Sequence, residues 1–340
     1  MIPAMNRPLL TTVLALGGGL SLTHADSLTL SGGALLNVRA DFGGLGVLGA
    51  VSNPGPVTGG AVTRTYDNGF VGVDVTGNGG DTTWNWGYQN AAQVQGGNLV
   101  FQSDTAAGTT VERNAGKDAH ASVELAWRKD FGEALGGRWG LLLGVGLQQV
   151  DIRSGAALAG GVTRTSDAYS LNGLPAAFIP TAPYSGSAAG PGPLISSVPS
   201  RTVSTVAGAL TVTGLRELDT RLVPFALGPS LEWDLGSDWS ATLAGGALLT
   251  WAEGDFRFTE SSTVPGRAPQ TALGAASGND WLFGGFVEAG LHWGFRPEAS
   301  LDFKVRWQAL EDYLLVANGR YGRLDLEAGV QLAAGLSWRF

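Results

Sequence analysis

The last part of the chain alternates strictly between two kinds of position. From Leu324 to Phe340 every second residue is apolar, and the residues between them, from Arg323 to Arg339, are small or polar. A period of two is the pattern of an extended strand whose two faces meet different surroundings. The run is also much longer than the roughly 5–6 residues of an ordinary soluble strand. We therefore predict one long strand over 323–340 with one apolar and one polar face.

The same alternation recurs in seven other segments, where one alternate set is apolar and the other is small or polar. These segments are 36–42, 122–128, 139–148, 223–233, 239–251, 281–296 and 301–309. Together with 323–340 they predict an all-β, antiparallel fold of about eight strands. Segment 66–104 has further apolar clusters at 70–75 and 99–101, which leave ten to twelve strands as the alternative. Because polar breaks interrupt that segment, we expect hairpins that extend beyond the main sheet.

The chain end and the connection lengths are similar to those of a known class of proteins. A terminal Phe340 with apolar residues at every second position before it resembles the C-terminal signature of bacterial outer-membrane β-barrels, such as the small OmpA and OmpX type. The connections alternate between short ones, at 132–137, 236–237 and 297–298, and long ones, at 43–118, 153–215 and 258–277. The resemblance implies a transmembrane barrel with short periplasmic turns and long external loops. A soluble β-sandwich is the alternative, but it would not place its Trp side chains in bands.

The first segment predicts export. Residues 1–25 contain an early Arg7, an apolar stretch from Leu9 to Leu22, and small residues at Thr23 and Ala25. This is the pattern of a signal peptide cleaved near Ala25. The stretch is interrupted by glycines and is shorter than the roughly 20 residues of a spanning helix. We expect a mature barrel of residues 26–340 in the outer membrane, in contact with lipid and lipopolysaccharide and assembled by the barrel-assembly machinery through the strand ending at Phe340.

Composition narrows the function classes. The chain has 340 residues, a formal net charge of -8, 44% hydrophobic residues and no Cys. Nucleic-acid binding is excluded because phosphate contacts need an excess of Lys and Arg. Thiol chemistry and Cys metal sites are excluded as well. The 53 Gly residues crowd the polar faces of the predicted strands, as the interior of a narrow barrel requires. No cofactor and no metal are expected.

Charged residues of both signs fall on the predicted inward face, where they suggest a network that fills the lumen. The predicted lumen residues are Arg39, Asp41, Glu124, Arg128, Glu232, Asp234, Glu288, His292, Arg296, Asp302, Lys304, Arg306, Asp325, Glu327 and Arg339. Since eight strands leave room only for side chains, we favour a closed lumen with a structural or surface-interaction role. A narrow channel for small polar or charged solutes is the alternative.

Aromatic residues of the apolar face cluster beside the short turns and predict a membrane-interface girdle. The predicted girdle residues are Trp127, Trp139, Trp233, Trp239, Trp293, Phe295, Phe303, Trp338 and Phe340.

The candidates for chemistry are few. His120, with Asp118 and Glu124 nearby, lies at the predicted outer rim, where outer-membrane hydrolases carry catalytic His and acidic residues. One such pair is weak evidence for a general base, so no enzyme is expected and no catalytic residue is assigned. In the first long loop, Trp84, Trp86 and Tyr88 are expected to form a small aromatic core, because so long a loop needs packing of its own.

Overall fold

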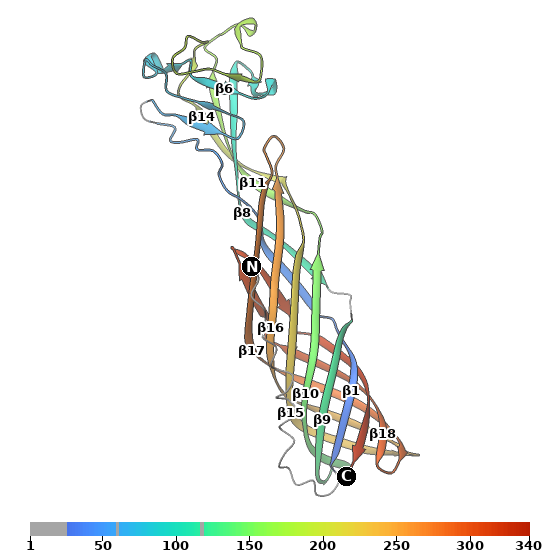
Figure 1. The fold of residues 1–340 in the computed structure, drawn as a ribbon. Helices are drawn as coiled ribbons and strands as arrows, with labels where there is room; N and C mark the ends of the chain where they lie inside the picture. The colour runs from blue at the N-terminus through green and yellow to red at the C-terminus, as the bar shows by residue number, and fades with distance from the viewer. Residues whose placement is uncertain (1–25, 59–60, 116–118) are drawn as a thin grey trace, which may run out of the picture.

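Eight strands close into an antiparallel ring at one end of the molecule. The computed structural model describes residues 26–58, 61–115 and 119–340, so the predicted signal peptide lies outside the described residues. The ring runs β1 (Ser27–Leu36), β9 (His120–Ala134), β10 (Gly137–Ser154), β15 (Arg216–Gly236), β16 (Trp239–Thr263), β17 (Gln270–Arg296), β18 (Ala299–Leu310) and β21 (Gly329–Arg339), and β21 pairs with β1. The predicted β-barrel is therefore confirmed, and Figure 1 shows its tilted strands around the C-terminus. Within the described residues, no helix is long and apolar enough to span a membrane.

The first and last strands differ from the prediction. The first barrel strand is β1, and the segment predicted for it, 36–42, lies mostly in the next strand, β2 (Arg39–Leu48). Between β1 and β2 Asn37 adopts a left-handed conformation with φ of 59°, and its side-chain amide donates to the carbonyl of Ala328 at 2.7 Å. At the same height the predicted strand 323–340 breaks into β20 (Arg320–Asp325) and β21. The segment that follows β1 and the segment that precedes β21 thus leave the barrel at the same place.

The three segments expected to be loops contribute strands that extend the same sheet beyond the barrel. β8 (Asn98–Ala115), β11 (Leu158–Ser170), β14 (Ser200–Thr213) and β19 (Tyr313–Ala317) join β2, β20 and the far end of β16 in the order β16-β14-β11-β8-β2-β20-β19. We call these strands, with the far halves of β10, β15, β16 and β17, the stalk. The whole sheet has fifteen strands, which exceeds the number predicted. Figure 1 shows the stalk continuing the long axis of the barrel.

The apolar face changes sides where barrel becomes stalk. On β16, Leu243, Leu249 and Trp251 face outward, and the outward positions beyond them are Glu253 and Asp255. The inward positions follow the opposite order: Ala244 and Gly246 lie in the barrel, and Ala252, Phe256 and Phe258 are buried in the stalk. β15 changes in the same way between Arg221 and Val223, and β10 between Leu147 and Gln149. Each strand is thus apolar outside in the barrel and apolar inside in the stalk.

The break in 323–340 has the same cause. Leu324 and Leu326 are fully buried in the stalk core, whereas Leu332 and Leu336 are 44% and 40% exposed on the barrel. The alternation therefore continues through the turn, but the turn rotates the apolar set from the inside to the outside.

Beyond the stalk lies a small domain that we call the head. Its short strands are β3 (Arg64–Tyr66), β4 (Gly69–Val71), β5 (Thr82–Thr83), β6 (Trp86–Tyr88), β7 (Val94–Gln95), β12 (Tyr184–Ser185) and β13 (Ile195–Ser196), which pack over the far ends of β8 and β11. Trp86 and Tyr88 are almost completely buried in the core of the head, and Trp84 lies partly buried beside them. The predicted aromatic core is confirmed for Trp86 and Tyr88, whereas Trp84 lies outside this cluster. Figure 1 shows β6 at the end of the molecule farthest from the barrel.

A buried polar cluster holds the head together. The hydroxyl of Tyr66 lies 2.5 Å from Asp167 and 2.6 Å from the hydroxyl of Tyr169, and Arg201 donates two hydrogen bonds to Asp167 at 2.7 and 2.6 Å. Arg201 also donates to the carbonyls of Pro54 and Gly55. Asp167 is completely buried, so its charge depends on these donors.

We expect the head to lose stability at alkaline pH. Burial, followed by the nearby Tyr169 and Asp167, raises the pKa of Tyr66 far above 10, and burial raises the pKa of Tyr169 to about 12. A phenol whose pKa is raised on folding stabilises the folded state below its unfolded pKa of about 10. That stability is lost as the pH rises from about 10 to about 12. Ultraviolet absorbance of phenolate should show these two tyrosines ionising only as the head opens, and Tyr169→Phe should weaken the dependence. Normal ionisation of both near pH 10 would contradict the buried cluster.

Candidate functional site

The middle of the barrel lumen is filled by a four-residue charge network. Arg306, whose side chain is 1% exposed, donates to Glu124 through both terminal nitrogens and to Glu288 through Nε at 2.8 Å. Lys304 pairs with Glu124 and lies 3.7 Å from Glu288. Two cations thus face two carboxylates, and each buried charge has an opposite partner.

A second network lies nearer the short turns. Glu232 accepts from Arg128, from Arg138 at 2.5 Å and from Arg339 at 2.5 Å. Arg128 also lies 2.8 Å from Asp130. Because these side chains come from β9, β10, β15 and β21, the network ties four strands across the barrel.

Above the charges the lumen becomes uncharged and then apolar. Gln148 and Gln308 are almost fully buried and lie 3.5 Å apart, and the guanidinium of Arg306 lies 4.9 Å from the ring centroid of Phe286. Beyond them, Leu35 and Leu248 belong to the same buried apolar cluster as the stalk core. Glycines let the strands approach closely at this level: a Cβ on Gly228 would lie 2.1 Å from the carbonyl oxygen of Gly245. The lumen is therefore packed with side chains from the charge networks up into the stalk.

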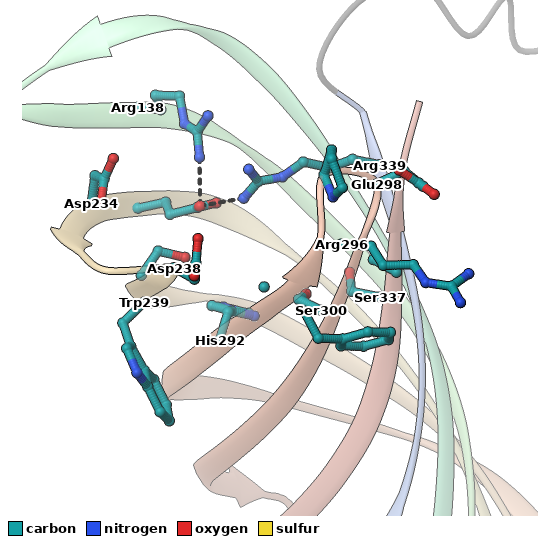
Figure 2. Close-up of a pocket in the computed structure, with 16 residues that line it drawn as sticks. Arg138, Asp234, Asp238, Trp239, His292, Arg296, Glu298, Ser300, Ser337 and Arg339 are labelled. Atoms are coloured by element: carbon teal, nitrogen blue, oxygen red, sulfur yellow. Dashed lines mark hydrogen bonds and ion pairs between the residues drawn. The ribbon is translucent and has the colours of Figure 1, made fainter.

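The mouth of the barrel beside the short turns opens into a vestibule of about 410 Å³. Figure 2 shows Arg138, Arg339 and His292 on its walls, with Asp234, Asp238 and Arg296 at its rim. Its lining carries fixed charges of both signs. The vestibule ends at the Glu232 network.

His292 lies on the inward face of the barrel wall. Its Nδ1 lies 2.8 Å from Asp302, and its Nε2 lies 2.9 Å from the hydroxyl of Thr242. Asp302 also accepts from Ser300 at 2.8 Å and from Thr29 at 3.2 Å. A hydroxyl, an imidazole and a carboxylate in this order also occur in hydrolase triads. Here both ring nitrogens are bound within the wall, and the cluster links β1, β16, β17 and β18.

Several predicted lumen residues lie elsewhere. Four of them lie in the stalk, close to the barrel: Arg39 and Asp41 at the start of β2, Asp325 at the end of β20, and Glu327 in the turn after β20. Asp41 pairs with Arg323. Their prediction was wrong because the chain leaves the barrel at the Asn37 turn, a break that the continuous alternation conceals. Asp234 and Arg296 are exposed at the vestibule rim because the strands end there.

The predicted girdle residues face outward. Trp139, Trp239, Trp293 and Trp338 are each 36–43% exposed and lie near the short turns, and Phe295 and Phe340 lie at that end as well. Trp127 and Trp233 are half-buried, and Phe303 is 50% exposed. A further pair, Trp251 and Trp281, packs edge to face at the stalk boundary.

In the candidate group around His120, Glu124 is engaged in the lumen network. His120 is buried in the wall at the start of β9, opposite Leu35, and the carboxylate of Glu124 is bound to Lys304 and Arg306. Asp118 lies outside the described residues. Across the part of the chain that the structure describes, no group of three or more His, Asp or Glu side chains is arranged to hold a metal ion.

The sequence analysis missed two members of the lower network, Arg138 and Asp130. Both lie on the inward alternate set of their strands, one residue before Trp139 and two residues after Arg128. Extending the alternation by one position at each strand end would have found them.

Comparison with known proteins gives distant structural likenesses. No family model and no curated protein matches the sequence. Similar solved structures include the attachment invasion locus protein Ail of Yersinia pestis in complex with the heparin analogue sucrose octasulfate, with 8% identity, coverage of 93% of this chain and 100% of that chain, and a TM-score of 0.27. The outer membrane protease OmpT of Escherichia coli has 11% identity, covers 95% and 99%, and gives a TM-score of 0.32. These identities and TM-scores are too low to indicate a function for this chain.

Proposed function

We propose that this chain is an integral outer-membrane β-barrel of a Gram-negative cell, in which a closed barrel anchors a stalk and a head that interact with partners at the cell surface. The observation that carries the proposal is the change of the apolar face along single strands. In the barrel the outward apolar side chains form a continuous band, and such a band needs a lipid surface to cover it. The stalk also exposes apolar side chains, among them Leu273, Leu314 and Val316, but the outward positions of its long strands are mostly polar.

The height of the apolar band fits a membrane. On β17 the outward face is apolar from Trp281 to Trp293, with eleven residues between the two Trp side chains. A transmembrane strand needs about 9–11 residues to cross the hydrocarbon layer. Outward residues inside the band are strongly exposed, with Phe283 at 61% and Val287 at 51%.

The connection lengths give the orientation. The hairpins β9-β10, β15-β16 and β17-β18 turn within two residues each at the vestibule end. Outer-membrane barrels have short turns on the periplasmic side and long segments outside. In this orientation the vestibule faces the periplasm, and the stalk and the head project from the cell.

A binding role is favoured over transport because charge networks and apolar packing close the lumen above the vestibule, with a small cavity of about 60 Å³ between the two networks. In planar lipid bilayers we expect no conductance steps from the purified protein. Glu288→Gln should also give none, because the apolar packing above the network remains. Steps whose size changes in Glu288→Gln would instead show the narrow channel and overturn the closed lumen.

The membrane assignment has its own test. Detergent-folded protein should migrate differently on a gel before and after boiling and should give a β-dominated circular dichroism spectrum. A water-soluble protein without such a shift would contradict the proposal.

A further inference from the structure

A groove opens where the head meets the tip of the β16-β17 hairpin. Its volume is about 370 Å³, within the range of roughly 300–1,000 Å³ of small-ligand sites. Four segments line it: the turn after β3, the stretch around β6 and β7, the start of β8, and the hairpin residues 265–267. The groove is separate from the barrel lumen and from the vestibule.

Amide side chains dominate the groove. They are Asn68, Gln89, Asn90, Gln93, Gln95 and Gln102. Some of them shape the wall, since Gln93 accepts from the backbone amides of Gln89 and Asn90 at 3.0 Å. The side chains of Gln89 and Gln102 make no hydrogen bond to other described residues. A primary amide both donates and accepts, so these two can serve a ligand that does the same.

The charges that line the groove are already paired. Asp104 accepts a two-pronged contact from Arg164 at 2.8 and 2.7 Å. Arg267 lies 3.5 Å from Asp67 and donates to the carbonyls of Asp104 and Gly49 at 2.5 and 2.6 Å. A charged ligand would meet a like charge beside each opposite one, so the groove favours an uncharged ligand.

Two polar atoms of residues that line the groove are buried without a protein partner among the described residues. They are Oδ1 of Asp67, on a side chain 7% exposed, and Nε of Arg267, on a side chain 3% exposed. Buried polar atoms nearly always have a partner. One of these atoms accepts and the other donates, which is the pairing that a hydroxyl group can satisfy at both sides.

We propose that this groove binds a neutral saccharide. Sugar hydroxyls would bond in both directions with the amides of Gln89 and Gln102. A hydroxyl would reach Oδ1 of Asp67 and Nε of Arg267 when binding opens the contact between these two side chains. The C–H face of the sugar would lie against Val100 and Pro265, which line the same groove. The assignment adds a ligand class to the surface role proposed above and rests on that role only for the exposure of the head outside the cell.

The test is binding of the detergent-purified full chain to an array of immobilised neutral oligosaccharides of hexoses and N-acetylhexosamines, with sialylated and sulfated glycans alongside. We expect binding to neutral glycans. Binding to acidic glycans alone, or to no glycan above the level of an unmodified surface, would overturn the proposal. The boiling shift, measured on the same sample, tests the membrane barrel separately, so the two proposals can fail independently.

Substitutions in the groove test whether the saccharide binds there. Gln89→Ala with Gln102→Ala should weaken binding at least about tenfold, because two hydrogen-bonding amides are lost, and Asp67→Asn should act in the same direction. The matched control is Gln149→Ala, an amide on the outer face of the stalk. If Asp67→Asn does not fold, the Gln89/Gln102 variant still decides. Unchanged binding in that variant would place the saccharide elsewhere and overturn the proposal.

Discussion

Arg306→Met is expected to destabilise the barrel more than any other single lumen substitution. Arg306 is the donor shared by Glu124 and Glu288, and all three side chains are buried. Without it, two carboxylates compete for Lys304 alone. Removing one partner of a buried ion pair costs about 3–5 kcal/mol because the remaining charge has no compensation. The free energy of unfolding, followed by Trp fluorescence in denaturant, should fall by about that amount.

A double variant separates lost charge pairing from lost packing. Arg306→Met with Glu288→Gln leaves one carboxylate, Glu124, with one ammonium, Lys304, which already contact each other. We expect this variant to recover most of the lost stability. The surface control is Arg257→Met on the stalk, where the side chain is 66% exposed and should contribute under about 1 kcal/mol. A loss no larger in Arg306→Met than in this control would show that the network does not stabilise the barrel.

Val287→Arg should have the second large effect, on insertion. Val287 faces outward on β17 in the middle of the apolar band between Trp281 and Trp293. An Arg at the midplane of a membrane barrel costs about 2–4 kcal/mol. Folding into lipid vesicles, measured by protection from protease and by the boiling shift, should be reduced accordingly.

The matched substitution lies on the same face of the same strand. Asn279→Arg is outward and exposed, beyond Trp281 in the stalk. In water this change should stay within about 0.5 kcal/mol. Equal tolerance of the two substitutions would mean that the band does not contact lipid, and the membrane assignment would fail.

The sequence predicted the barrel because its strands are long and their alternation is regular. Seven of the eight predicted segments overlap barrel strands along most of their length, and the closed ring joins them in antiparallel order. The lumen residues on continuous strands, such as Glu124, Glu288 and Arg306, meet as predicted. Along one unbroken barrel strand, alternation fixes which residues share a face, so the charges of these strands meet in the lumen.

The alternation does not say which face is the inside. In the segments 36–42 and 323–326, apolar residues fill the stalk core, although the same pattern faces outward in the barrel. The alternation of apolar and polar residues is the same in the barrel and in the stalk because each strand has one apolar face in both places. Only the surroundings, which are packed side chains inside the stalk and, as we propose, lipid outside the barrel, decide the direction in which that face points.

By itself, the sequence determined the two-faced strands, seven of the eight that close the barrel, the short turns between them, and the buried Trp86 and Tyr88 of the head. Tertiary structure decided where strands turn over at Asn37, which segments form the stalk, and which residues meet across it, including the groove between Asp67 and Arg267. The physical reason is that alternation is a local property set by neighbouring residues. The stalk pairing and the groove join segments as far apart as 200 positions in the chain, and that proximity depends on closing the whole sheet.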